Sequence, residues 1–218
     1  MRSPNSHASW RHRIVFGAIL WTSWGCFESV KADPGFANPS STTTSIAQIS
    51  PLLQPEQFDR ATLMREANRY IREQNYSEAE TLVRQLLERD PRDASLYYKL
   101  GIVLAAQYQD ADAELAYQRA IDLEERYVLA LNGLGELYSS QSRWNEALIV
   151  YEQAVDIESS YTDAQLGRGQ ALWQLGQDRE AIQVLNVAIE QLIDREDIWR
   201  AISVSNLIQQ IERMQDIV

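Results

Sequence analysis

The sequence has very few of the side chains that enzymes use as thiol nucleophiles, imidazole bases or soft-metal ligands. Its 218 residues include one cysteine and two histidines, which are Cys26, His7 and His12. From residue 27 onward the chain therefore has no thiol, imidazole, disulfide or soft-metal site. Carboxylates remain, and they can act as acid or base groups or bind a hard cation. We predict a protein that is not an enzyme and has no metal site and no cofactor.

The sequence also lacks a long apolar run near its start. The run "IVFGAILWTSW", residues 14–24, follows several arginines but has only 11 residues, whereas a membrane-spanning helix needs about 20. Val30 and Ala32 form a small-residue cleavage pattern. We predict that residues 1–32 are a signal peptide and that the protein is exported to a periplasm, a lumen or the exterior. An uncleaved N-terminal membrane anchor is the alternative, and a cytosolic amphipathic start or a lipoprotein signal at Cys26 are weaker ones.

Positive charge is scarce. The chain has 20 Lys and Arg against 31 Asp and Glu, a formal net charge of -11. Removing residues 1–32 takes away four basic residues and one acidic residue, so the net charge becomes -14. Binding to nucleic acid or to anionic lipid depends on Lys and Arg that neutralise phosphate. We therefore predict no nucleic-acid partner, and contact with a membrane only if the N-terminal segment is retained.

Proline is rare except in one segment. Residues 33–58 hold four of the six prolines and a Ser/Thr cluster, without a sustained apolar period. Such a composition predicts a flexible linker. A second cleavage site near Ala47 is an alternative that leaves the rest of the chain unchanged. The full chain is 45% hydrophobic and 23% charged, the balance of a globular protein, so the part after this linker is expected to fold.

Beyond residue 58, small residues recur at a spacing of 34. A small residue allows two antiparallel helices to cross with their backbones close together. Apolar residues recur around each of these positions at helical spacing. Each unit is therefore predicted to be a helical hairpin. The two columns of small residues are Ala67, Gly101, Gly135 and Gly169, and Ala79, Ala113, Ala147 and Ala181.

Polar residues near the start of each second helix are candidate caps. Ser77 stands three residues before Glu80, which is the spacing of a capping box. Later units offer side-chain oxygens that can accept hydrogen bonds from free backbone N–H groups. These acceptors are Asp110 or Asp112, Asn145 and Asp178.

The sequence resembles the tetratricopeptide repeat family, whose unit has 34 residues and whose signature includes a Gly or Ala, a Tyr, a later Ala and a final Pro. Tyr70 and Tyr138 occupy the Tyr column, and Pro91 alone occupies the Pro column. The resemblance implies an all-α fold, a right-handed α-solenoid of four tandem helical-hairpin repeats within residues 59–195. These repeats span about 60–93, 94–127, 128–161 and 162–195. Residues 196–215 resemble one more first helix, with Trp199 and Ile202 in packing columns, and are predicted to form a C-terminal capping helix.

The resemblance also implies a concave groove lined by the first helices. The residues beside the packing columns form an i, i+4, i+7 stripe on each first helix. We call these residues the groove stripe. They are Met64, Asn68, Ile71, Tyr98, Ile102, Ala105, Asn132, Glu136, Ser139, Leu166, Gln170 and Trp173. The predicted peptide-binding residues among them are Asn68, Tyr98, Ile102, Asn132, Glu136, Gln170 and Trp173.

The groove stripe combines aromatic and amide side chains. Tyr98 and Trp173 offer flat apolar contact, and the alternative is that they pack between neighbouring repeats. Amide groups, such as that of Asn132, can donate and accept hydrogen bonds with an extended peptide. Asn132 is expected to be exposed, which favours a binding role. Glu136 and the acidic composition suit a partner segment that is neutral or basic.

Some members of the family hold the terminal carboxylate of a partner with several Lys, Arg and Asn side chains. Here the corresponding region contains a single cation, Lys99. This departure argues against such a clamp for a chaperone tail.

Three classes of function follow. The first is an exported scaffold that binds a protein or peptide in its groove, as an assembly or secretion factor. The second is a structural module that associates with other copies of itself. The third, a hydrolase that uses carboxylates, has little support because no nucleophile, base and oxyanion site gather in the sequence.

Overall fold

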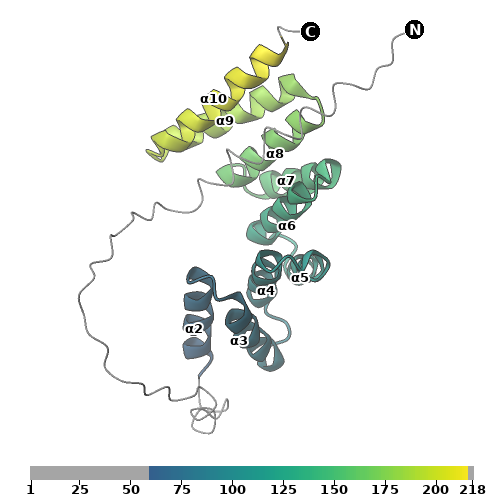
Figure 1. Ribbon diagram of the computed structural model, residues 1–218, viewed down its shortest axis with the longest axis vertical. Helices are drawn as coiled ribbons and strands as arrows, with labels where there is room; N and C mark the ends of the chain where they lie inside the picture. The colour runs from purple at the N-terminus through teal and green to yellow at the C-terminus, as the bar shows by residue number, and fades with distance from the viewer. Residues whose placement is uncertain (1–58, 216–218) are drawn as a thin grey trace, which may run out of the picture. The chain divides into compact units, whose positions relative to one another are not determined.

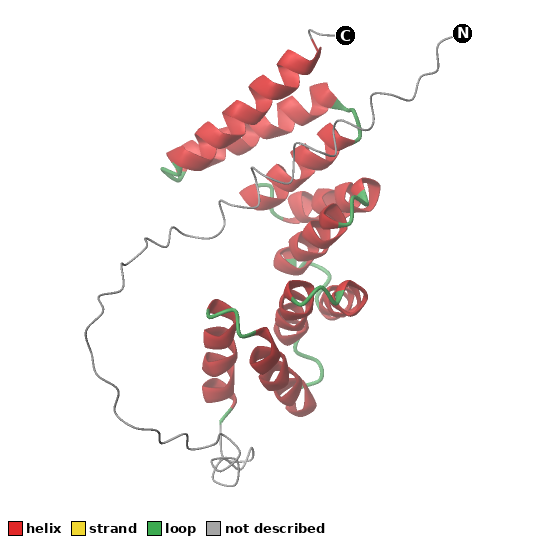
Figure 2. Ribbon diagram, viewed as in Figure 1, coloured by secondary structure: helices red, strands yellow, loops and turns green. Residues whose placement is uncertain are grey.

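The computed structural model describes residues 59–215, and within this range it contains nine helices and no strand (Figures 1 and 2). The predicted signal peptide and linker lie outside the described residues. The predicted all-α solenoid class is confirmed. The helices are α2 (Arg60–Arg72), α3 (Tyr76–Arg89), α4 (Ala94–Ala106), α5 (Asp110–Leu123), α6 (Val128–Ser140), α7 (Trp144–Ile157), α8 (Thr162–Gln174), α9 (Asp178–Asp194) and α10 (Ile198–Gln215).

The helices pair in chain order. α2 packs on α3, α4 on α5, α6 on α7 and α8 on α9, and each second helix also contacts the first helix of the next pair. Figure 1 shows these hairpins following one another along the chain. The first helices α4, α6 and α8 also contact each other in turn. Each hairpin therefore buries its apolar face against its neighbours, as in other repeat arrays.

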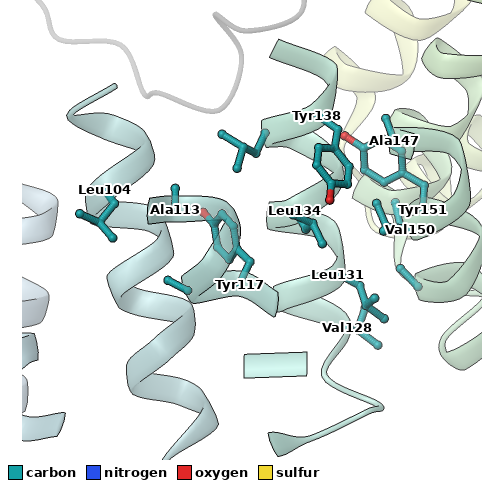
Figure 3. Close-up of a cluster of buried hydrophobic side chains, with 14 of the residues drawn as sticks. Leu104, Ala113, Tyr117, Val128, Leu131, Leu134, Tyr138, Ala147, Val150 and Tyr151 are labelled. Carbon is teal, nitrogen blue, oxygen red and sulfur yellow. The ribbon is translucent and has the colours of Figure 1, made fainter. Parts of the chain in front are cut away.

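A tyrosine from the second repeat fills the space between two first helices. A Cβ built on Gly101 of α4 would lie 2.6 Å from Tyr117 Cδ1, and one built on Gly133 of α6 would lie 2.8 Å from Tyr117 Cε1. Tyr117 is 4% exposed, and Figure 3 shows it among the buried apolar side chains. The two glycines are therefore required by close approach, because any side chain there would meet the ring.

The same arrangement recurs one repeat later around Tyr151. A Cβ on Gly135 or on Gly167 would lie 2.5 Å or 2.3 Å from its ring carbons. In the first repeat the equivalent ring is replaced by the smaller Val83, and the position equivalent to Gly133 is then Lys99. The spacing of the helices is thus set by matched ring and glycine pairs.

The turns inside the hairpins share one unusual backbone conformation. Gln74, Tyr108, Ser142 and Gly176 lie 34 residues apart, and their φ angles are 61°, 59°, 59° and 80°. Only glycine adopts this left-handed region without a steric cost from Cβ. Each second helix begins two residues after the left-handed residue. The turn thus fixes where the second helix starts.

The predicted caps of the second helices are wrong. The N-cap residues of α3, α5, α7 and α9 make no side-chain cap hydrogen bond. Ser77 lies inside the first turn of α3, and its carbonyl oxygen accepts a hydrogen bond from Thr81 Oγ1 at 3.0 Å. The physical reason is the left-handed turn, which starts each second helix before the predicted capping residues.

The C-terminal helix α10 packs on α9. Its buried side chains include Val204, Ile208 and Ile211. Trp199 and Ile202, in contrast, are 83% and 48% exposed, although their columns are buried in the inner repeats. The described chain contains no second helix after α10 that would cover them. No helix within residues 59–215 is long and apolar enough to cross a membrane.

Candidate functional site

The groove stripe lies on the first helices, and α6 has α4 and α8 as its neighbours. The stripe residues differ in exposure. Asn68, Tyr98, Ile102 and Gln170 are half-buried, and Glu136 is exposed. The sequence therefore places an accessible carboxylate among partly accessible aromatic, apolar and amide groups. That these groups contact a peptide stays a prediction.

Asn132 is buried, so the expectation that it is exposed is wrong. It is 6% exposed, because α6 is packed between α4 and α8. Its Nδ2 donates a hydrogen bond to Glu136 Oε1 at 2.8 Å. Its Oδ1 is also buried and has no hydrogen-bond partner within the described part of the chain. Asn132 therefore orients the Glu136 carboxylate and leaves one acceptor unmatched.

The two aromatic residues of the stripe differ in their surroundings. Trp173 is 2% exposed, which supports the alternative that it packs between helices. Tyr98 is half-buried, with its ring centroid 6.1 Å from that of Tyr117 and 5.5 Å from that of Tyr127. The Tyr98 and Tyr127 rings meet edge to face at 69°, a favourable arrangement of aromatic pairs. Tyr98 thus both packs and presents part of its surface.

Two further tyrosines next to the stripe were missed by the sequence analysis. The N-cap residues of α2 and α4 are Asp59 and Asp93, whose carboxylates accept hydrogen bonds from backbone N–H groups at 2.6 Å and 2.8 Å. The same positions in the next repeats are Tyr127 and Tyr161, and neither makes a side-chain cap hydrogen bond. The signal was the 34-residue spacing of the two tyrosines, outside the packing columns.

The electrostatics of the stripe centre on Glu136. The protein that surrounds its carboxylate limits its solvation and raises its pKa, while the hydrogen bond from Asn132 opposes this shift and the charge of Asp163 adds to it. The side chain is nevertheless exposed, as expected for a group that lies between neighbouring helices. Burial, then the charge of Glu136, raises the pKa of Tyr98 to about 12. Burial also raises the pKa of Tyr161, with Asp163 and Glu136 as further causes.

The cations near the stripe are engaged or partly buried. Asp163 forms an ion pair with Arg200 of α10. Lys99 is half-buried, and burial lowers its pKa against the opposing charge of Asp93. Within residues 59–215, no ion pair joins Glu136 to a Lys or Arg. The centre of the stripe is therefore acidic.

Other candidate sites carry less chemistry. The described residues contain no group of three or more His, Cys, Asp or Glu side chains placed to hold a metal ion. A shallow pocket is lined by residues from the first two repeats, including Arg84, Tyr97 and Leu115, but it includes no residue of the groove stripe.

Comparisons with known proteins agree with the repeat assignment. The tetratricopeptide repeat model matches residues 64–125, and a second model, described as TPR repeat, matches residues 135–176. No curated protein matches the chain.

Several solved structures are similar to this chain. A crystal structure of MamA is 24% identical with a TM-score of 0.61, and the match covers 70% of this chain and 89% of MamA. Yeast Tom70 is 20% identical with a TM-score of 0.63, covering 78% of this chain and 36% of Tom70. The first TPR domain of Spaghetti (RPAP3), bound to the HSP90 peptide SRMEEVD, is 21% identical with a TM-score of 0.51, covering 53% and 92%. At these identities the likeness is one of fold.

Proposed function

Because the chain belongs to the tetratricopeptide repeat family, we propose that it is an exported, non-catalytic scaffold that binds a protein or peptide segment along the groove stripe. The observation that carries the proposal is the exposed Glu136 on α6, with half-buried Tyr98 on α4 and Gln170 on α8 on the neighbouring helices. The peptide bound to the RPAP3 domain supports this kind of activity. The acidic centre of the stripe suits a segment that is neutral or basic.

The proposal includes export and a role in assembly or secretion. It rests for export on the pattern of residues 1–32, which has the features of a cleaved signal. The intact mass of the protein from the exported fraction tests this part, and we expect a chain that begins at Asp33. A chain found only in the cytosol would contradict export.

The binding role is tested by capture with a groove variant. Trp173 and Asn132 are buried, so replacing them would disturb the fold as well as binding. The variant instead carries Asn68→Arg and Gln170→Arg, which place two bulky cations on the half-buried part of the stripe. The matched control carries Asn186→Arg and Gln118→Arg at exposed positions of α9 and α5. Both variants change the same residue types and the same charge.

The tagged full-length chain and both variants are used to capture proteins from the exported fraction. A protein that is enriched by the wild type and by the control, and lost with the groove variant, supports binding on the stripe. Equal enrichment by all three chains contradicts it. Circular dichroism checks that each variant keeps its helix content.

A second function, self-association, is favoured by the C-terminal helix. Trp199, Ile198 and Ile202 are 83%, 49% and 48% exposed on α10, and apolar side chains that gather on a surface often mark an interface. Light scattering of the wild type and of Trp199→Ser with Ile202→Ser tests it. A dimer that the double variant converts to a monomer supports self-association, and a monomeric wild type at all concentrations tested contradicts it.

A further inference from the structure

The centre of the groove stripe has acceptor atoms that no donor matches. Glu136 Oε1 accepts the hydrogen bond from Asn132 Nδ2, and the described residues give its carboxylate no cationic partner. Asn132 is more than nine-tenths buried, and its Oδ1 has no hydrogen-bond partner within residues 59–215. A buried acceptor without a donor costs free energy. The missing group is therefore a hydrogen-bond donor, and the carboxylate favours a donor with positive charge.

Tyrosines stand on both sides of this carboxylate. Tyr98 belongs to α4 and Tyr161 is the N-cap residue of α8, and these two helices are the neighbours of α6. At the position of Tyr161 the first two repeats have a capping Asp, and giving up such a cap costs about 0.5–2 kcal/mol. Local rules are commonly broken where a function requires it. Aromatic faces attract cations, most of all flat guanidinium groups.

We propose that Glu136, Asn132, Tyr98 and Tyr161 form a subsite for an arginine side chain of the segment that lies along the groove stripe, an inference that rests on the proposed function. Arginine fits better than lysine because its planar guanidinium carries five N–H donors and stacks on aromatic rings. A lysine ammonium is a point charge with a tighter hydration shell. A guanidinium would also supply the positive charge that the crowded carboxylate lacks, in keeping with the raised pKa of Glu136 in the free protein.

The test uses short fluorescein-labelled peptide libraries that share random uncharged flanks and differ only in the central residue. The central residues are arginine, lysine, citrulline and glutamate, of which citrulline is the neutral isostere of arginine. Binding to the full-length chain is measured by fluorescence polarisation. Because a hydrogen bond to a charged group contributes more than a neutral one, we expect the arginine library to bind about tenfold tighter than the citrulline library. Lysine should lie between them, and glutamate should bind most weakly.

Glu136→Gln is the decisive variant, and Glu190→Gln, which removes the same charge from an exposed position of α9, is its control. We expect Glu136→Gln to abolish the preference for arginine over citrulline, and the control to keep it. Equal binding of the arginine and citrulline libraries to the wild type would overturn the subsite. If both libraries then lose affinity for the Asn68→Arg, Gln170→Arg variant, the proposed groove function stands without the subsite.

Three other outcomes would also overturn the inference. One is an arginine preference that survives Glu136→Gln, which would move the cation elsewhere. Another is a lysine library that binds as tightly as the arginine library. The last is the absence of binding by all of the libraries, in which case the groove function is decided separately by the capture experiment.

Discussion

The ring of Tyr151 occupies the space where a side chain at Gly167 would begin, since a Cβ on Gly167 would lie 2.3 Å from Tyr151 Cζ. Real Cβ atoms do not approach a ring carbon so closely, so the ring or the helix would have to move. Tyr151 is 3% exposed and has little room to shift in a packed interior. The contact joins the second helix of the third repeat to the first helix of the fourth.

Gly167→Ala should therefore lower the free energy of unfolding. Overpacking a core costs about 1–3 kcal/mol, which outweighs the gain of about 1 kcal/mol or less from removing a helical glycine. Urea denaturation measures the net loss. In a Tyr151→Val background the same change should cost less, because the smaller residue leaves room, as Val83 does beside Lys99. Equal costs in both backgrounds would contradict the contact.

Ser142→Gly should raise the free energy of unfolding. Ser142 has a φ angle of 59° in the turn between α6 and α7, a conformation that costs a residue with a Cβ about 1–2 kcal/mol. Thermal denaturation should show a higher midpoint for the variant. Ser203→Gly, at an exposed position inside α10, is the matched control and should lower the midpoint, because glycine destabilises a helix interior. A shift of the same sign in both variants would contradict the argument.

The C-terminal helix should depend on its buried face and not on its tryptophan. Ile211 is 0% exposed and Trp199 is 83% exposed. Ile211→Ala should lower the free energy of unfolding by about 2–5 kcal/mol, and Trp199→Ala should change it by about 0.5 kcal/mol or less. Denaturation of both variants at a concentration where the protein is monomeric makes the comparison. A large loss with Trp199→Ala alone would show that α10 packs through the other face.

Stability should depend on pH through Glu136. Its pKa is raised in the folded protein, chiefly because the surrounding protein limits solvation of the carboxylate. A raised pKa means that the stabilising form is the protonated one, so its contribution is complete below the ordinary value of 4.5 and is lost as the pH rises through the raised pKa. Glu136→Gln stays neutral, so it should be more stable than the wild type at pH 7.

This difference should shrink as the pH falls toward 4.5 and below, and thermal melts across the range follow it. Glu190→Gln removes a charge from an exposed position and provides the control for net charge. A Glu136→Gln variant that is less stable than the wild type at pH 7 would contradict the prediction, and would mean that the ionised carboxylate has a stabilising partner.

Much of the fold could be predicted from the 34-residue spacing. The columns that contain Ala79 and Gly135 can repeat only if equivalent helices cross at equivalent points, so the hairpins and their order follow from them. The helix starts could not be predicted as well, because Gln74 and Ser142 adopt a left-handed conformation that neither residue type signals. The repetition of that turn at 34 residues is visible only once the backbone is known.

The candidate site was predicted in outline. The helical period placed Tyr98, Asn132 and Glu136 beside the packing columns, and they do lie on adjacent first helices. The period could not tell how deeply the neighbouring helices cover each position. Asn132 and Trp173 share the stripe with Glu136, yet they are buried and Glu136 is exposed.

The sequence by itself determined the repeating hairpin, because a helix with one small-residue column and one apolar face has few ways to bury both. It also determined the shortage of thiol and imidazole chemistry, which is a matter of composition. Only the tertiary structure decided that Tyr161 stands beside the Glu136 carboxylate and that Asn132 keeps an unmatched acceptor. These relations join residues of different repeats, and they depend on the packing of α6 against its two neighbours rather than on any local pattern.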